Sequence, residues 1–197
     1  MNHTKCLKLI VVTSLLLILS LVLKMTLNMT TGYNKNSILL DQVYHYKVDD
    51  EGNAYIELHK DGQYFIYFGK NIYASDEKLK EKRSFEEIGG IYPELILTQG
   101  KFDKQHNEIL LKPQYSTIIR FYDISALHKK RYFEKETKKL VPSAGGKIIF
   151  SWRGLYYQTK GINKKVHKIK LKKSSKPIPS SEEDFLEQYT YVPDMGN

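Results

Sequence analysis

The chain has 197 residues, with 31 Lys or Arg against 22 Asp or Glu, a formal net charge of +9 and a single cysteine, Cys6. One cysteine excludes an intrachain disulfide and a metal site with several cysteine ligands. Only four of the 31 basic residues are arginine, the residue that nucleic-acid sites favour, so the composition argues against nucleic-acid binding.

The N-terminal part contains the longest apolar run. Residues 9–23 (LIVVTSLLLILSLVL) carry no charge and lie between Lys8 and Lys24. Fifteen helical residues span about 22 Å, less than the ~30 Å membrane core, but flanking lysines can snorkel and lengthen the span. No small-residue cleavage site follows the run, although its length also fits a cleaved signal peptide. We therefore expect an uncleaved, single-pass transmembrane helix that acts as a signal-anchor.

The remainder predicts one domain on the extracytoplasmic side, periplasmic or elsewhere in the cell envelope. About 165 residues are enough for one hydrophobic core. The 15 tyrosines and 8 phenylalanines favour half-buried strands. The predicted organisation is a signal-anchor at 1–29, a linker at 30–37, an antiparallel β domain at 38–173 and a polar, mobile tail at 174–197.

The clearest strand signal is a β-hairpin at residues 54–68, with an Asp61-Gly62 turn. Two registers are open. One pairs Leu58 with Phe65, and the other pairs Leu58 with Tyr64 and leaves Gly62 left-handed. We prefer the second register because it separates apolar from polar residues more cleanly on the two faces.

A polar, lid-like segment follows at 69–90, in which Ser75 can cap a short helix. Gly100 indicates a bulge or a close approach, and Pro113 is expected to end a strand. Residues 125–140 fit either a basic helix or a strand and turn. Further strands are expected at 38–48, 91–102, 108–112, 116–124, 147–152, 155–159 and 166–172.

Positive charge gathers in the C-terminal half. Residues 126–176 contain 16 Lys or Arg and two acidic residues, Glu134 and Glu136. Lysines occupy alternate positions in 166–172, which places them on one outward face of a strand. The candidate binding residues are these basic and aromatic side chains: Lys164, Lys165, Lys168, Lys170, Lys172, Trp152, Tyr156 and Tyr157.

No catalytic motif is present. The six histidines show no metal-ligand spacing, and no nucleophile elbow or phosphate loop occurs. Tyr55, Glu57 and His59 share one strand face, which we interpret as exposed polar surface and not as a proton-transfer site. The sequence therefore assigns no catalytic residue, no metal ligand and no cofactor.

Residues 54–112 resemble small exported bacterial domains with a lipocalin-like meander. The resemblance is carried by the Asp-Gly hairpin, the Gly-Lys-Phe strand at 100–102 and the Ile-Leu-Leu strand at 109–111. It implies an antiparallel sheet around a ligand-sized or side-chain-filled interior, and no catalysis.

The sequence thus predicts a mainly β protein, an antiparallel meander or partly open barrel preceded by a transmembrane helix. The first functional hypothesis is a non-catalytic, membrane-anchored binding protein whose β cavity takes an apolar ligand or an envelope component. The second is an immunity- or inhibitor-type protein that docks an acidic protein partner with its basic half. An enzyme without a recognisable motif is the third, because catalytic groups can be far apart in a sequence.

Overall fold

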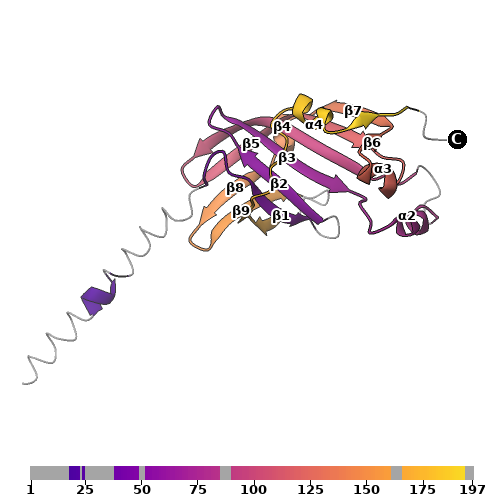
Figure 1. Cartoon of the computed structure of the whole chain (residues 1–197). Helices are drawn as coiled ribbons and strands as arrows, with labels where there is room; N and C mark the ends of the chain where they lie inside the picture. The colour runs from indigo at the N-terminus through magenta and orange to yellow at the C-terminus, as the bar shows by residue number, and fades with distance from the viewer. Residues whose placement is uncertain are drawn as a thin grey trace, which may run out of the picture.

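The computed structural model describes residues 18–22, 24, 38–48, 52–84, 90–160 and 166–193. From Ile38 onward an antiparallel sheet curls into a nearly closed barrel (Figure 1). The mainly β, barrel-like prediction is therefore confirmed. The strands of this sheet are β1 (Tyr44–Val48), β2 (Gly52–Leu58), β3 (Gln63–Lys70), β4 (Glu94–Gln105), β5 (Glu108–Arg120), β7 (Glu134–Lys139), β8 (Lys147–Ser151), β9 (Gly154–Lys160), β10 (Val166–Lys170) and β11 (Lys172–Lys173).

One C-terminal stretch of chain brings the two ends of the sheet together and nearly closes the barrel. The strand order is β10-β9-β8-β5-β4-β3-β2-β1-β11, so β10 and β11 are the two ends of the sheet. Only Leu171 separates them in sequence. The same stretch therefore pairs with β9 through Lys170–Tyr156 and with β1 through Lys173–Tyr44.

The β2–β3 hairpin adopts the register that separates the two faces. Leu58 pairs with Tyr64 and Ile56 with Ile66. Gly62 has φ +85°, the left-handed conformation that this register requires. The preferred register and the conformation of Gly62 are both confirmed.

Gly62→Val is expected to destabilise the fold by about 1–3 kcal/mol, because a β-branched residue resists positive φ. A Cβ at this position would meet no atom within 4 Å, so the cost comes from the backbone alone. Thermal unfolding followed by circular dichroism measures the effect, with Gly62→Asn as the control because asparagine tolerates this conformation better. An unchanged melting temperature for Gly62→Val would contradict the turn geometry.

Strands β4 and β5 are longer than expected. We predicted that Pro113 would end a strand, and this was wrong: β5 runs through it to Arg120. The register shifts between Gln99 and Gly100, where Gly100 faces Pro113. Proline has no N–H to donate, and a bulge is where a sheet tolerates that loss.

Strand β5 has two partners on its outer edge. Its first residues, Glu108–Leu110, pair with β8, and its last residues, Tyr115–Arg120, pair with β7. The sheet therefore forks beyond Leu110. The connection from β7 to β8, with a 3-10 turn η2 (Pro142–Ala144), crosses this fork.

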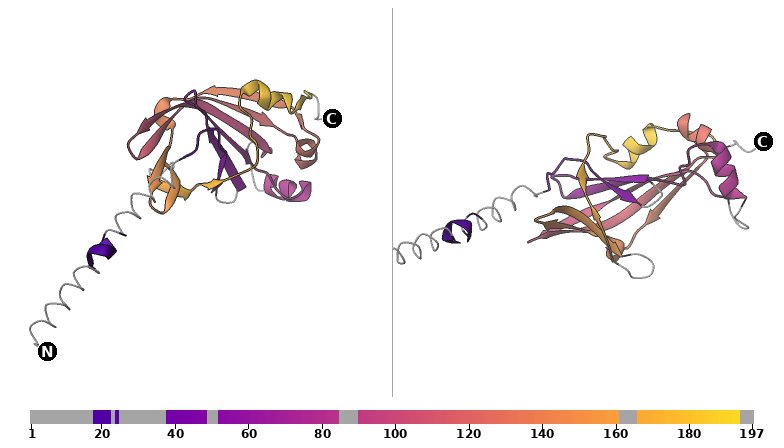
Figure 2. Two further views of the ribbon diagram at one scale, coloured as in Figure 1. Left: turned by 60° about the vertical axis from the view of Figure 1, so that its left-hand side comes forward. Right: turned by 90° about the horizontal axis from the view of Figure 1, so that it is seen from below.

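Two apolar cores lie on the two faces of the sheet. The inner core lies inside the barrel, and its buried residues include Tyr44, Ile56, Leu58, Ile109 and Ile148. The outer core lies under the C-terminal segment (Figure 2) and includes Val43, Phe65, Leu97, Phe121, Ile178 and Phe185.

The C-terminal segment is not the mobile tail that its composition predicts. Helix α4 (Glu182–Glu187), capped by Ser181, buries Phe185 completely in the outer core. The short strand β12 (Thr190–Tyr191) then pairs in parallel with β6 (Arg131–Tyr132). The C-terminal segment docks on the sheet through only a few apolar residues. Its mainly polar composition therefore did not indicate that it would be ordered.

The remaining helices are short. Helix α2 (Asp76–Arg83) starts at Ser75, whose hydroxyl accepts from the Lys78 N–H, so the predicted cap is confirmed. Helix α3 (Ile124–His128) is capped by Asp123. Residues 125–140 thus combine the two alternatives, a helix followed by strands.

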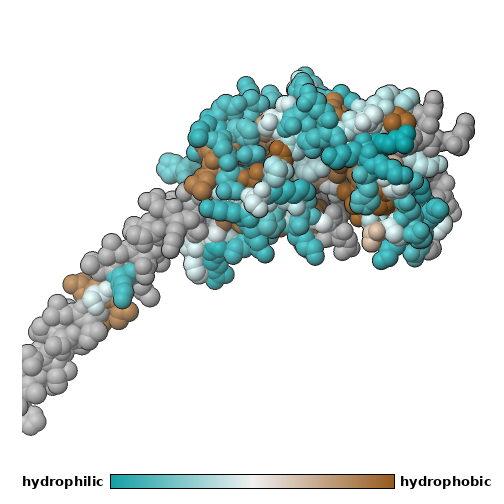
Figure 3. Space-filling view, viewed as in Figure 1, coloured by the Kyte–Doolittle hydropathy of each residue, from teal (hydrophilic) through white to brown (hydrophobic). Residues whose placement is uncertain are grey.

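The N-terminal prediction falls mostly outside the described residues. Residues 18–22 and Lys24 are helical. Ile18, Leu19, Leu21 and Val22 are all exposed, and they stand out as hydrophobic in Figure 3, where the visible surface of the barrel is mainly hydrophilic. Among the described residues, no helix is long and apolar enough to cross a membrane.

Candidate functional site

A cavity of about 310 Å³ lies inside the barrel at the fork in the sheet. Its wall comes from the inward faces of the strands and from the β7–β8 connection. The described residues that line it carry no charge: Tyr46, Val48, Ala54, Tyr64, Ile66, Phe68, Thr98, Leu111, Pro113, Leu140, Ala144, Gly145, Gly146, Tyr157, Thr159 and Ile169. The volume is at the lower end of the range for small-molecule sites.

Residues 140–146 form the wall where the sheet forks. The Leu111 N–H donates to the Gly146 carbonyl over 3.0 Å, which ties this segment to β5. A Cβ on Gly145 would lie 1.8 Å from the Leu111 carbonyl oxygen. Only glycine therefore lets the segment lie this close to β5 and form the cavity wall.

Three tyrosines supply polar groups to the cavity, in addition to Thr98 and Thr159. The rings of Tyr46 and Tyr157 lie 4.9 Å apart between centroids, and Tyr64 is their neighbour on β3. The Tyr157 hydroxyl bonds to Thr159. Residues that the structure describes form no hydrogen bond with the hydroxyl of Tyr46 or Tyr64. Two neutral donors are thus open to a ligand in a mainly apolar space.

The environment keeps these phenols protonated. Burial, reinforced by the neighbouring Tyr157 and Tyr64, raises the pKa of Tyr46 well above its usual value. Burial likewise raises the pKa of Tyr64 and that of Tyr157. The cavity therefore presents neutral hydroxyl groups at any physiological pH.

In an alkaline titration, Tyr46, Tyr64 and Tyr157 are expected to ionise only above the usual tyrosine pKa of about 10. Since their pKa is higher in the folded than in the unfolded chain, ionisation favours unfolding. Their contribution to stability is complete below about pH 10 and is lost as the pH rises through the folded-state values. Phenolate absorbance and circular dichroism measure this, and Tyr46→Phe should move alkaline unfolding to higher pH. Complete ionisation of all tyrosines near pH 10 with an intact fold would contradict the burial.

The structure distributes the predicted binding residues over three places. Lys168, Lys170 and Lys172 are exposed on the outward face, and the Lys168 ammonium lies 4.5 Å from the Tyr156 ring centroid. Trp152 is exposed at the β8–β9 turn. Tyr157 instead points into the cavity. The remaining two candidates, Lys164 and Lys165, lie outside the described residues.

Sequence reasoning did not assign Tyr46 and Tyr64 to a site. The signal was present in the alternation of strand residues. Tyr46 is two residues from Tyr44 and Val48, and Tyr64 shares its face with Ile66. Both phenols were therefore predictable as inward-facing, but the empty space beside them depends on the long-range fork in the sheet.

Other polar groups have structural partners. The Arg120 guanidinium donates to Glu94, Glu134 and Glu136 over 2.7, 2.6 and 2.9 Å, so three carboxylates already occupy it. His59 Nε2 is buried 3.5 Å from a Glu57 carboxylate oxygen without the geometry of a hydrogen bond. Within the described ranges, no group of three His, Cys, Asp or Glu side chains is arranged to hold a metal ion.

Comparison with known families, curated proteins and solved structures gives no match for this chain. The fold defines the class of the protein as an antiparallel, nearly closed barrel, with a tyrosine-bearing cavity whose described lining is uncharged.

Proposed function

We propose that this protein is a non-catalytic binding protein of the cell envelope, anchored in the membrane by residues 9–23. Its barrel cavity takes a small, neutral amphiphile with an apolar body and one hydrogen-bonding group. The observation that carries the proposal is the pair of unbonded hydroxyls, Tyr46 and Tyr64, in an apolar cavity of about 310 Å³.

The chemistry of the wall supports this class of ligand. Apolar side chains from several strands favour a hydrocarbon body, because contact removes apolar surface from water. The two phenols can donate to an ester, ether or hydroxyl oxygen. Among the described residues that line the cavity there is no lysine, arginine or histidine, so these residues offer a buried carboxylate no compensating positive charge. The cavity should therefore prefer a neutral ligand to its charged counterpart.

The test uses the full chain with ¹³C-labelled tyrosine rings, purified in detergent. Titration with decan-1-ol should give saturable shifts of the Tyr46, Tyr64 and Tyr157 resonances, each assigned with its Tyr→Phe variant. Exposed Tyr115 and Tyr122 serve as internal controls for unspecific partitioning. Decanoate should bind at least about tenfold more weakly, which corresponds to about 1.4 kcal/mol. Equal shifts at cavity and surface tyrosines would reject the proposal.

A second candidate function is the docking of an acidic protein partner. The observation that favours it is the exposed lysine face of β10, since residues 147–173 contain nine Lys or Arg and no acidic residue. Changing Lys168, Lys170 and Lys172 to glutamate should slow association with such a partner at low salt. The same change should leave the decan-1-ol titration unaltered, so the two functions are distinguishable.

A further inference from the structure

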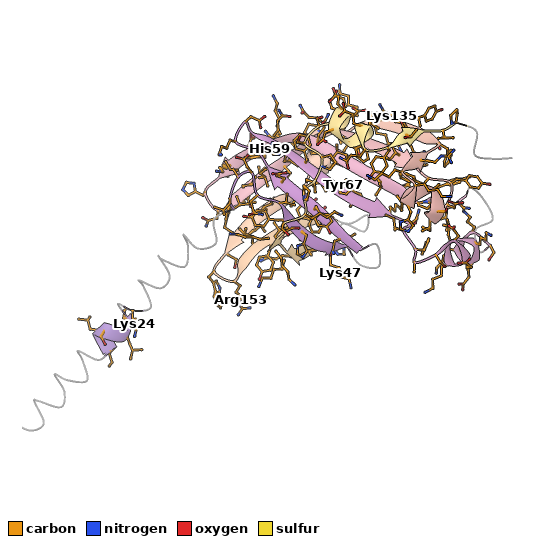
Figure 4. All side chains as sticks on the ribbon, viewed as in Figure 1. Lys24, Lys47, His59, Tyr67, Lys135 and Arg153 are labelled. Atoms are coloured by element: carbon orange, nitrogen blue, oxygen red, sulfur yellow. The ribbon has the colours of Figure 1, made fainter. Side chains whose placement is uncertain are left out.

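The β8–β9 turn lies at the end of the barrel where the described domain begins. The Asp41 N–H donates to the Leu58 carbonyl, and Leu171 donates to Leu155, so the start of β1 and the end of β10 are at this end. A Cβ on Gly154 would lie 3.3 Å from Lys170 Cε, which places Lys170 beside the turn. In Figure 4 the label of Arg153 marks this turn at the lower left of the domain.

The tip of this turn is amphipathic. The side chain of Trp152 is the most exposed large hydrophobic group that the structure describes, at 76%. The Arg153 guanidinium lies 4.5 Å from the centre of its ring. A tryptophan beside a cation is the combination that proteins place at membrane–water interfaces, where the ring meets the acyl boundary and the cation meets phosphate.

The segment that carries the tip, residues 147–173, contains basic side chains and no acidic ones. Arg153, Lys170 and Lys172 are all exposed. Clustered basic residues close to a bilayer are attracted to anionic headgroups over about one Debye length, ~8 Å at physiological ionic strength. The same field would repel other basic surfaces, so it favours an anionic partner.

The sequence sets how far this end can be from the membrane. Ile38 is 14 residues after Lys24, which closes the apolar run. Even a fully extended chain of that length reaches only about 50 Å, and a flexible one averages about 20 Å. The end of the barrel with Ile38 is therefore the end held near the bilayer.

From these observations we infer that the β8–β9 turn is a lipid-contact surface. Trp152 enters the interface of the bilayer, and Arg153, Lys170 and Lys172 bind phosphate groups of anionic lipids. The inference rests on the proposed anchoring by residues 9–23, and it is independent of the cavity ligand.

Trp152 is the one tryptophan in the chain, so its fluorescence reports on this turn alone. The experiment reconstitutes the full chain in vesicles of phosphatidylcholine with or without phosphatidylglycerol. Part of the phosphatidylcholine carries bromine on the upper acyl chain, which quenches tryptophan on contact. In anionic vesicles we expect most of the emission to be lost, with little effect of aqueous acrylamide. Neutral vesicles should quench less.

The charge-reversal variant Arg153→Glu/Lys170→Glu/Lys172→Glu should recover most of the emission. The matched control reverses three exposed lysines of α2, Lys78, Lys80 and Lys82, and should behave as the native chain does. Helix α2 lies at the far end of the domain (Figure 1).

Flotation of the vesicles separates the two ways in which the inference can fail. A chain that floats with the vesicles but whose Trp152 emission is unaffected by bromine would overturn the lipid contact and leave the anchoring intact. A chain that does not float would overturn both. Equal quenching in neutral and anionic vesicles would overturn the role of the basic residues.

Discussion

Ala54→Phe should abolish or strongly weaken the binding of a small amphiphile to the barrel. Ala54 is 1% exposed on β2, where it pairs with Tyr46 of β1 and lines the cavity. A phenyl ring there would occupy space that a ligand needs. Ala54 belongs to the inner core as well as to the cavity wall, so the added ring should also cost about 1–3 kcal/mol of stability, while the cavity gives it room and the fold should survive.

The expected effect on the decan-1-ol titration is a Kd at least about tenfold higher, equivalent to about 1.4 kcal/mol. The matched control is Ala74→Phe, which adds the same ring at an exposed position between β3 and α2. Circular dichroism checks that both variants are folded. Native affinity in a folded Ala54→Phe protein would mean that the amphiphile binds elsewhere.

The second large effect is expected at the C-terminal helix. Phe185→Ala should lower the free energy of unfolding by about 3–5 kcal/mol, because it removes a fully buried ring from the outer core. That ring packs against Tyr67 at 6.0 Å and Tyr189 at 5.8 Å between centroids. The Tyr67 and Tyr189 hydroxyls lie 3.3 Å apart and close this cluster.

Denaturant unfolding of the full chain measures this loss, with Leu186→Ala as the control. Leu186 is the neighbour of Phe185 and is only partly buried, so its truncation should cost less. Equal, small effects for the two variants would show that α4 contributes little to holding the outer face.

Local patterns in the sequence were sufficient for some elements. The hairpin of β2 and β3 followed from alternation and from the glycine at position 62, and the start of α2 followed from the cap at Ser75. Each of these depends on residues within one or two turns of chain. The outward lysines of β10 followed from the same alternation, with Ile169 and Leu171 facing inward.

Long-range pairing determined what the sequence did not reveal. The pairing of Tyr44 with Lys173 joins residues 129 positions apart (173 minus 44) and nearly closes the barrel. No local pattern encodes it. The fork at β5 also depends on long-range pairing, because this one strand changes its partner from β8 to β7. The cavity depends on both features, so its location could not be predicted even where its tyrosines could.

The outer core was missed for a different reason. Alternation predicted a polar outer face for β2 and β3, but Phe65 and Tyr67 on that face are covered by the C-terminal segment. A short helix with one deeply buried ring is enough to cover such a face, and its other residues stay polar. Composition averaged over 174–197 therefore concealed the few residues that dock the segment, Ile178 and Phe185 among them.

The most direct test of the central claim is the detection of magnetisation transfer between ligand and cavity. Isotope-filtered NOE spectra of the ¹³C-tyrosine chain with decan-1-ol should show cross-peaks from the ligand methylenes to the rings of Tyr46, Tyr64 and Tyr157. The exposed rings of Tyr115 and Tyr122 should show none above those of free detergent. Cross-peaks confined to exposed tyrosines, or cavity cross-peaks that persist in Ala54→Phe, would contradict a ligand site inside the barrel.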